Sequence, residues 1–280
     1  MVRRFVLLDI DGVLINPAGY TKALYDTCDY LLNKLGLRQI TINKEIIPVF
    51  ESIGITSEWD MIPIFLLLVV DECFASVNPV NIADLKESHN FFSNIRIRLS
   101  VDKILAKVGE LKTIIQPGES VCESIIRNNY RINNHEWFLN VRLFANWMIT
   151  DWLVGSRGFT RSEILQIFQT HVLGSDIYRE ITGLMPEFES KSYLIEHDRI
   201  IINDFYRSKF QKVYDERKIL SSFITARPSL HSAGFQTSNL NNTGLYFPEA
   251  ELALDLLGFQ EVPVVGFGPL EFVGRSLGVS

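Results

Sequence analysis

Two aspartates near the start of the chain have the spacing expected of a catalytic or ligand-binding site. Asp9 and Asp11 follow the apolar run Phe5–Leu8, and Gly12 comes directly after them. Such a run is typical of a buried parallel strand, and ligands bind where these strands end. Burying unpaired carboxylates is costly, so the pair is expected to meet a cation, a phosphate with a metal ion, or a proton-transfer task. The alternative is a strand-end turn in which Asp11 and Gly12 only supply turn geometry.

Elements that can position this pair lie in the last quarter of the chain. Ile219–Ile224 is predicted to be a short apolar strand that ends at Thr225, and Val262–Val265 another strand. Between them, Pro248–Leu257 is predicted to be a helix that Gly258 ends. The order strand, helix, strand is typical of a parallel sheet with crossover helices.

Most of the intervening sequence has helical periodicity. Five stretches carry the pattern: Lys22–Leu35, Trp59–Phe74, Val101–Thr113, Phe138–Leu153 and Arg161–Val172. We therefore predict an α/β fold with a Rossmann-like parallel sheet core, formed by residues 1–15 and 215–280. A large all-α module, residues 16–214, is inserted after the first strand. The 280 residues fit one large domain or two moderate ones.

Composition narrows the class of protein. The chain has 33 acidic and 27 basic residues and a formal net charge of −6, which argues against a nucleic-acid or anionic-membrane partner and favours a small molecule. The cysteines, Cys28, Cys73 and Cys122, are too widely spaced for a disulfide framework or a zinc knuckle. The longest apolar run, Met61–Val70, is far shorter than the roughly 20 residues of a membrane span. With no signal-like segment after Arg4, we expect a cytoplasmic protein.

Two segments carry a family resemblance. Phe5-Val-Leu-Leu-Asp-Ile-Asp-Gly-Val-Leu14 resembles the first motif of the haloacid dehalogenase-like hydrolases. The strand Ile219–Ile224, followed by Thr225 and Arg227, is similar to the second motif, in which an apolar strand ends in Thr or Ser. The helical module resembles the family's cap type that is inserted directly after the first motif. The resemblance therefore covers both ends of the chain by motif and the middle by architecture.

The resemblance implies a magnesium-dependent phosphatase that acts on a small phosphate ester. Asp9 would be the nucleophile that forms an aspartyl-phosphate, and Asp11 the general acid and then the general base. Magnesium would be held by Asp9 and by the backbone carbonyl of Asp11. Gly12 would allow the sharp turn beside the phosphate, and Thr225 would hold a phosphate oxygen through its hydroxyl. A dehalogenase is a weaker match, because in the family the second Asp marks the phosphatase branch.

The family's third and fourth motifs match only in outline. The third places a cation just before a proline, where this chain has Phe247. The fourth is a strand that ends in Gly-Asp-x-x-x-Asp; here Phe267 stands at the first acidic position and Glu271 at the second. A phenylalanine neither ligates magnesium nor carries positive charge. Glu271 is then the remaining candidate ligand beside Asp9 and Asp11.

These departures leave a second hypothesis open, a non-catalytic binding protein that keeps the fold. Arg227 either replaces part of the lost positive charge at the phosphate or is a surface turn residue before Pro228. The sequence ends sooner after Phe267 than the family's sheet usually does. We therefore expect an open sheet edge that a second copy or another partner covers.

Other chemistry-bearing residues form no clear motif. The histidines, His89, His135, His171, His197 and His231, lack metal-ligand spacing. The aromatic-rich segment from Trp137 to Trp152 either packs in the core or lines the face of the cap over the active site. The segment Glu58-Trp59-Asp60, at the start of an apolar helix, either presents polar groups to a substrate from the cap or only favours the helix dipole.

Overall fold

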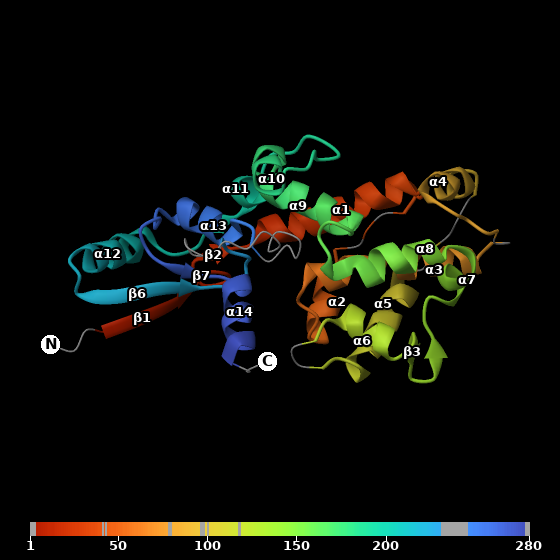
Figure 1. Ribbon diagram of the computed structural model, residues 1–280, viewed down its shortest axis with the longest axis horizontal. Helices are drawn as coiled ribbons and strands as arrows, with labels where there is room; N and C mark the ends of the chain where they lie inside the picture. Colours follow the sequence, from red (N-terminus) through yellow and green to blue (C-terminus); the bar gives the residue numbers. More distant parts are fainter. Residues whose placement is uncertain are drawn as a thin grey trace. The chain divides into compact units, whose positions relative to one another are not determined.

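The computed structural model describes residues 4–40, 42, 44–77, 80–95, 99, 101–116, 119–230 and 246–277. The chain divides into two compact units (Figure 1). Met1–Ala23 and Gln169–Ser280 form the first, called here the sheet unit, and Leu24–Phe168 form the second, the helical unit. Two long helices, α1 (Ala18–Lys34) and α9 (Glu163–Leu173), contain the points at which the chain passes between the units.

The sheet unit is built on a three-stranded parallel sheet in the order β1-β6-β7 (Figure 1). Its strands are β1 (Arg4–Asp9), β6 (Ile219–Ile224) and β7 (Val264–Val265). All pairings between these strands are parallel. The predicted α/β class and parallel sheet are confirmed, and the strand predicted over Ile219–Ile224 has the predicted bounds.

Short strands and helices complete the sheet unit. An antiparallel pair joins β2 (Ile15–Asn16) to β5 (Arg199–Ile200). The remaining helices of this unit are α10 (Ser175–Thr182), α11 (Tyr193–His197), α12 (Asp204–Asp215), α13 (Glu249–Leu257) and α14 (Phe267–Leu277). As predicted, α13 ends at Gly258, which has a φ of 76°. Glycine adopts this left-handed conformation without the strain that a side chain adds.

The boundaries between the units differ from those expected from the sequence. Residues 16–23 and 169–214, expected in the helical insertion, belong to the sheet unit. The β2–β5 pair ties the segment around Arg199 to Ile15, and the amide of Gly19 donates to Asp198 Oδ1 at 2.8 Å. These contacts join segments far apart in the sequence, so hydropathy patterns along the chain do not reveal them.

One face of the sheet carries the core of its unit. Phe223 is fully buried and packs in a cluster with Ile10, Leu14 and Phe259. The ring of Phe210, on α12, lies with its centroid 6.0 Å from that of Phe223 and 5.3 Å from that of Phe259. Because side chains alternate along a strand, the neighbours of Phe223 point to the opposite face.

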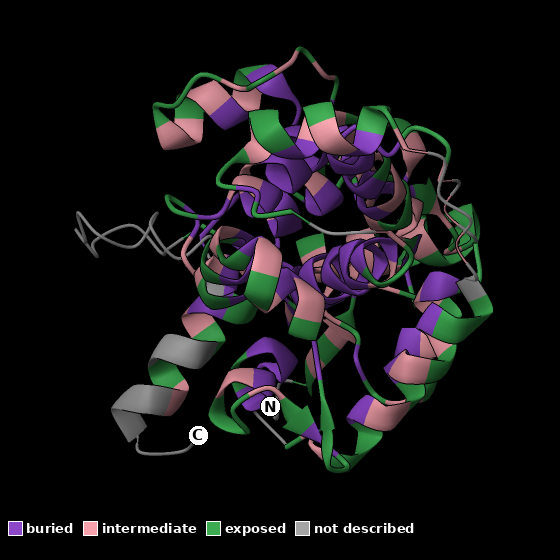
Figure 2. Cartoon of the chain, turned by 90° about the vertical axis from the view of Figure 1, so that its right-hand side faces the viewer, coloured by how far each residue is buried: buried purple, intermediate pink, exposed green. Residues whose placement is uncertain are grey.

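The helical unit surrounds a buried central helix, α3 (Glu58–Ala75), whose residues are buried without a break from Trp59 to Asp71. Figure 2 shows buried residues gathered in the middle of this unit and exposed residues around it.

The other helices of this unit surround α3. They are α2 (Ile46–Ser52), α4 (Leu85–Ser93), α5 (Val101–Glu110) with a 3₁₀ turn Leu111–Thr113, α6 (Val121–Arg127), α7 (Leu139–Phe144) and α8 (Asn146–Met148). A π-helical turn, Ile149–Leu153, and a 3₁₀ turn, Val154–Arg157, follow, and a small hairpin pairs β3 (Arg131–Ile132) with β4 (His135–Glu136). Among the described residues, no helix has the length and apolar character needed to cross a bilayer.

The stretch Phe138–Leu153, predicted to be helical, is helical over most of its length but is divided between several short helices. The helix breaks at Ala145, which has a φ of −146° and a ψ of 48°. The carbonyl of Phe144 accepts a hydrogen bond of 2.7 Å from the amide of Ile82. A partner distant in sequence thus replaces a bond within the helix. The aromatic residues of this stretch do pack in the core, because Trp137, Phe138 and Trp152 are buried.

Two aspartates of the buried helix α3 hold the starts of two other helices. Asp60, 3% exposed, accepts hydrogen bonds from Ser120 Oγ at 2.5 Å and from the amide of Val121 at 3.2 Å, at the start of α6. Asp71 accepts from the amides of Asn140 and Val141 at 2.8 and 3.3 Å, at the start of α7. The Asp60 carboxylate is therefore buried against the first residues of α6 and is not presented to a substrate.

The pKa of Asp71 predicts a pH dependence of stability. Burial raises this pKa above the ordinary value of 3.8, although the amides of α7 and Lys107 oppose the rise. The folded chain therefore binds this proton more tightly than the unfolded chain does, so the resulting stability is present at low pH and is lost as pH rises through the raised pKa. We therefore expect the wild type to lose stability against Asp71→Asn as pH rises. The free energy of unfolding of the wild type minus that of Asp71→Asn should be lower at about pH 7 than at about pH 4.

This dependence can be measured by urea denaturation at both pH values. The matched control is Asp102→Asn, at an exposed position of α5, which should show no such trend against the wild type. A difference between wild type and Asp71→Asn that stays constant with pH would contradict the prediction.

Candidate functional site

The two motifs that the sequence places at opposite ends of the chain meet at one edge of the sheet. The register of β1 and β6 pairs Asp9 with Ile224, so the residues that follow both strands emerge together. There Thr225 Oγ1 donates a hydrogen bond of 3.0 Å to Asp11 Oδ2, across 214 residues of sequence. Parallel pairing brings the carboxyl ends of strands to the same edge. Asp11 and Thr225, one from each motif, therefore lie in direct contact.

Arg227 forms the centre of a buried ion-pair cluster. Its Nε and Nη2 atoms donate to Asp11 Oδ1 at 2.9 and 2.6 Å, and Nη2 also donates to Asp198 Oδ2 at 2.8 Å. The side chains of Arg227 and Asp198 are each 1% exposed, whereas that of Asp11 is 28% exposed. Arg227 is thus not a surface turn residue. It binds two carboxylates inside the protein, and neither Arg227 nor Thr225 lies open to solvent.

Asp198 is the member of this cluster that sequence reasoning missed. Its Oδ1 atom accepts from the amide of Gly19 in the first turn of α1, and its Oδ2 atom accepts from Arg227. Burial raises the pKa of Asp198, and Arg227 and the Gly19 amide oppose this rise. A side chain on Gly19 would place its Cβ 2.7 Å from the carbonyl oxygen of Tyr193. Asp198 lies in a segment assigned to the cap, and no motif marks it.

Tyr20 and Glu249 add further polar groups to the cluster. The guanidinium carbon of Arg227 lies 5.0 Å from the centroid of the Tyr20 ring, a distance typical of a cation–π contact. The Tyr20 hydroxyl donates to Glu249, which is 1% exposed and also accepts from Gln169 Nε2 at 2.9 Å. Burial and the nearby Glu249 carboxylate raise the pKa of Tyr20 well above 10.0. The cluster therefore joins loops after β1 and β6 to the starts of α1 and α13.

Asp9, the expected nucleophile, lies outside this cluster. Its side chain is exposed at the end of β1, where Oδ1 accepts a hydrogen bond of 2.8 Å from the amide of Ile10. Gly12 has a φ of 74°, and its amide donates to the carbonyl of Ile15 at 2.8 Å. The sharp turn expected after Asp11 is therefore present. The role of Gly12 at a phosphate stays a prediction.

The segment aligned with the fourth motif does not follow a neighbour of β1. In the sheet order β1-β6-β7, β6 separates β7 from β1, and strands in a sheet lie about 4.8 Å apart. Phe267 and Glu271 follow β7, about two strand spacings from Asp9. Gly266 is packed tightly beside the end of β6, since a Cβ there would lie 2.4 Å from the Arg227 carbonyl oxygen. Glu271 belongs to α14, but its side chain is outside the described part of the structure.

The position aligned with the third motif is also core rather than site. Phe247 is fully buried, and so is Ala250 in the first turn of α13. The amide of Ala250 donates to the carbonyl of Pro228 at 3.0 Å, which places the start of α13 beside the loop after Arg227. His231, which has no metal-ligand spacing in the sequence, lies outside the described residues.

Magnesium is the cofactor that the resemblance implies. In the described part of the chain, no three His, Cys, Asp or Glu side chains lie close enough together to hold a metal ion. The carboxylate of Asp11 is bound by Arg227 and Thr225. Of the two aspartates at this sheet edge, Asp9 is therefore the one whose side chain can accept a cation. Magnesium requires near-octahedral oxygen coordination. The ligand predicted from Asp11 is its backbone carbonyl, and the side chain of Glu271 is outside the described part of the structure, so a magnesium site formed by Asp9, Asp11 and Glu271 stays a prediction.

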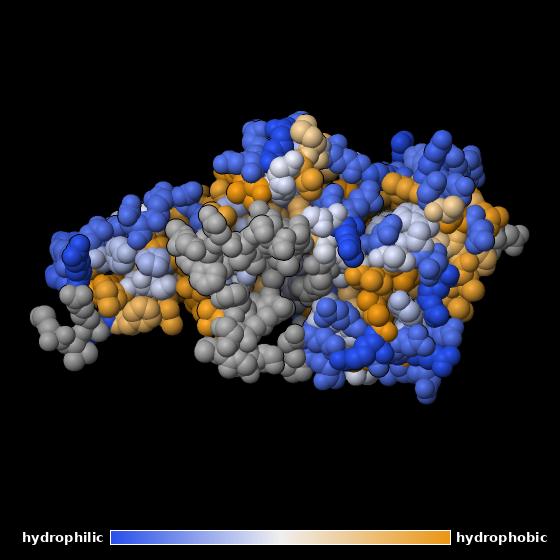
Figure 3. Space-filling model, in the orientation of Figure 1, coloured by the Kyte–Doolittle hydropathy of each residue, from blue (hydrophilic) through white to orange (hydrophobic). Residues whose placement is uncertain are grey.

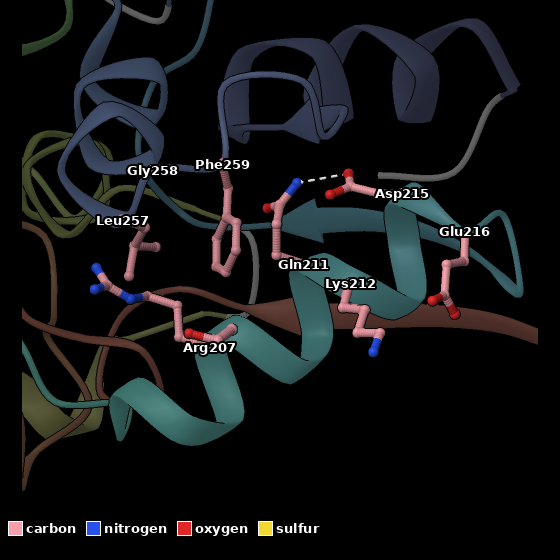
Figure 4. Close-up of a pocket in the computed structure, with 9 residues that line it drawn as sticks. Arg207, Gln211, Lys212, Asp215, Glu216, Leu257, Gly258 and Phe259 are labelled. Carbon is pink, nitrogen blue, oxygen red and sulfur yellow. Dashed lines mark hydrogen bonds between the residues drawn. The ribbon is translucent and has the colours of Figure 1, made fainter.

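A pocket of about 560 Å³ lies elsewhere in the sheet unit, between α12 and the end of α13 (Figure 4). Its lining includes Arg207, Gln211 and Lys212 from α12, and Leu257 and Phe259 from the other wall. Gln211 Nε2 donates to Asp215 Oδ1 at 2.8 Å within it. None of the residues expected to do chemistry lines this pocket.

Comparison with known proteins gives a likeness of fold. No protein-family model matches this chain, and no curated protein gives a significant match. The X-ray structure of a target of the Northeast Structural Genomics Consortium is similar over 99% of this chain and 73% of that one, with 11% identity and a TM-score of 0.61. Phosphatase Tt82 from Thermococcus thioreducens is similar over 94% of this chain and 72% of that one, with 15% identity and a TM-score of 0.47. The similarity to the first structure extends over both units and is a similarity of fold. The TM-score of the second comparison is too low to support any further conclusion.

Proposed function

We propose that this chain is a phosphatase-like hydrolase of small phosphate esters, with Asp9 as the nucleophile. The observation that carries the proposal is the meeting of both motifs: Asp9, Asp11 and Thr225 emerge at one edge of a parallel sheet, where such sheets bind ligands. Asp9 is exposed there and makes no ion pair in the described structure. An ionised carboxylate of this kind is a competent nucleophile toward phosphorus.

The proposed reaction has two steps. In the first, a carboxylate oxygen of Asp9 bonds to phosphorus, the bond between phosphorus and the ester oxygen breaks, and Asp11 gives a proton to the leaving oxygen. In the second, Asp11 accepts a proton from water, and that water attacks the acyl-phosphate. Inorganic phosphate leaves and Asp9 is restored. Arg227 and Thr225 would orient Asp11 through their hydrogen bonds to it.

The test is hydrolysis of an aryl phosphate by the 280-residue chain, with and without added magnesium. We expect phosphate release by the wild type and its loss in Asp9→Asn, because an amide is a far weaker nucleophile. The matched control is Asp255→Asn, an exposed position on α13, which should keep wild-type turnover. Unchanged turnover in Asp9→Asn, or a folded wild type that releases no phosphate, would count against the proposal.

One observation favours a second function, that of a non-catalytic protein with a phosphatase-like fold. The carboxylate of Asp11 is occupied by Arg227 and Thr225, and Asp198 in turn holds Arg227. On this hypothesis the motif residues stabilise the loops after the strands. Asp11→Asn would then lower the melting temperature without any phosphatase activity being present to lose.

A further inference from the structure

The pocket between α12 and the end of α13 has the size of a small-molecule site (Figure 4). Its volume of about 560 Å³ lies in the range of roughly 300–1,000 Å³ that ligand pockets occupy. The segments that line it lead into the starts of β6 and β7, whereas Asp9 and Thr225 lie at the ends of β1 and β6. The pocket is therefore separate from the proposed hydrolase site.

One wall of the pocket is a stripe of polar side chains on α12, over which Figure 3 shows hydrophilic residues. Arg207, Gln211 and Asp215 follow one another at intervals of four residues. Their Cα atoms therefore lie about 6 Å apart on nearly the same side of the helix. Lys212 and Glu216, also in the lining, are exposed and of opposite charge. Along the stripe a cation, a neutral amide and an anion succeed one another.

Gln211 places an unused hydrogen-bond acceptor in this stripe. Its Nε2 atom donates to Asp215 Oδ1 at 2.8 Å, which fixes the orientation of the amide. Its Oε1 atom is buried and accepts no hydrogen bond from any described residue, and Figure 4 shows this oxygen on the side of Phe259. An acceptor buried without a donor costs free energy. A ligand with an N–H or O–H group would satisfy it.

The charged ends of the stripe are only weakly engaged within the protein. Arg207 Nη2 pairs with Asp204 Oδ1 at 2.8 Å, but the Asp204 side chain is 85% exposed. Ion pairs with such exposure contribute little, because water screens them. The guanidinium carries five N–H donors, so this one contact does not saturate it. At the other end the exposed carboxylate of Asp215 accepts from Gln211 through Oδ1, its one hydrogen bond with the described residues.

The opposite wall of the pocket is apolar and held in place by the core. It is formed by Leu257, the last residue of α13, and by Phe259. The centroid of the Phe259 ring lies 5.3 Å from that of Phe210 and 5.5 Å from that of Phe223. A hydrocarbon group laid against this wall would lose contact with water, which favours its binding.

We propose that this pocket binds a free α-amino acid with an apolar side chain. The carboxylate of the ligand binds the guanidinium of Arg207, and its ammonium donates to Gln211 Oε1 and faces Asp215. Its hydrocarbon side chain packs against the apolar wall. A simple anion would leave the Gln211 oxygen without a donor, and a simple cation would leave Arg207 without a ligand, whereas a zwitterion satisfies both. This inference does not rest on the proposed hydrolase activity.

Isothermal titration calorimetry of the full chain with L-leucine tests the proposal. We expect a dissociation constant of about 1 mM or lower. N-acetyl-leucine lacks the ammonium and leucinamide lacks the carboxylate, so each should bind at least about 10-fold more weakly. L-Serine keeps both charges without the hydrocarbon and should also bind more weakly than L-leucine. These ligand controls use the wild type and do not depend on any variant folding.

Two variants locate the ligand in the pocket. Arg207→Met removes the cation and Gln211→Leu removes the acceptor, and each should raise the dissociation constant of L-leucine at least about 5-fold. The matched control is Lys209→Met, an exposed position of α12 outside the lining, which should bind like the wild type. Circular dichroism confirms that each variant is folded.

Three results would overturn the proposal. The first is a wild type that binds L-leucine more weakly than about 1 mM. The second is equal affinity for L-leucine and N-acetyl-leucine, because the ammonium would then have no role. The third is a folded Arg207→Met or Gln211→Leu that binds no more weakly than Lys209→Met, because the ligand would then lie elsewhere.

Discussion

Arg227→Met is expected to lower the free energy of unfolding by about 3–5 kcal/mol. Methionine keeps much of the side-chain volume but removes the cation that binds Asp11 and Asp198. Asp198, 1% exposed, then remains as a buried carboxylate with one hydrogen bond from the Gly19 amide. Removing one partner of a buried ion pair costs far more than the pair contributes, because the charge left behind is uncompensated. Urea denaturation of the wild type and the variant measures the loss.

Two further variants separate this effect from a general loss of packing. Arg207→Met removes an arginine of α12 that pairs with Asp204 on the surface, and it should cost less than about 1 kcal/mol. The double variant Arg227→Met with Asp198→Asn should recover part of the stability, because the amide removes the unpaired charge. A cost for Arg227→Met no greater than that for Arg207→Met, or no recovery in the double variant, would contradict the role assigned to the cluster.

Asp60→Ala is expected to destabilise the helical unit by about 2–4 kcal/mol. The Asp60 carboxylate accepts hydrogen bonds from the hydroxyl of Ser120 and from the amides of Val121 and Cys122. These donors are buried with it, so alanine would leave them without an acceptor and without access to water. A cap supplied by a neighbouring helix also holds α3 against α6. The loss should therefore exceed that of an ordinary exposed cap.

Asp84→Ala is the matched control for this prediction. Asp84 caps α4 from its own N-terminus, accepting from the amide of Glu87 at 2.8 Å at an exposed site. Its loss should cost about 1 kcal/mol, because water can replace the acceptor. Circular dichroism during chemical denaturation gives both values. Equal costs for the two variants would show that burial does not strengthen the Asp60 cap.

The site was predicted from the sequence in part. The Asp9 to Gly12 turn and the strand that ends at Thr225 have strong local signals, an apolar run followed by polar or turn residues. The contact between Asp11 and Thr225 follows from these two elements once they pair in parallel. Asp198 has no local signal, since it contacts Arg227 only because the β2–β5 pair brings its segment back to the sheet unit.

The amino-acid sequence by itself determined the elements whose cause is local. The apolar run over Ile219–Ile224, the periodicity of Trp59–Phe74 and the glycine that ends α13 each predict a structure from adjacent residues. Tertiary structure alone decided which distant elements meet. It placed β7 beside β6 and away from β1, and it broke the helical stretch Phe138–Leu153 at Ala145. The reason is physical. Strand order and buried polar pairs are chosen by the free energy of contacts between distant segments, and a local pattern of hydropathy does not record those contacts.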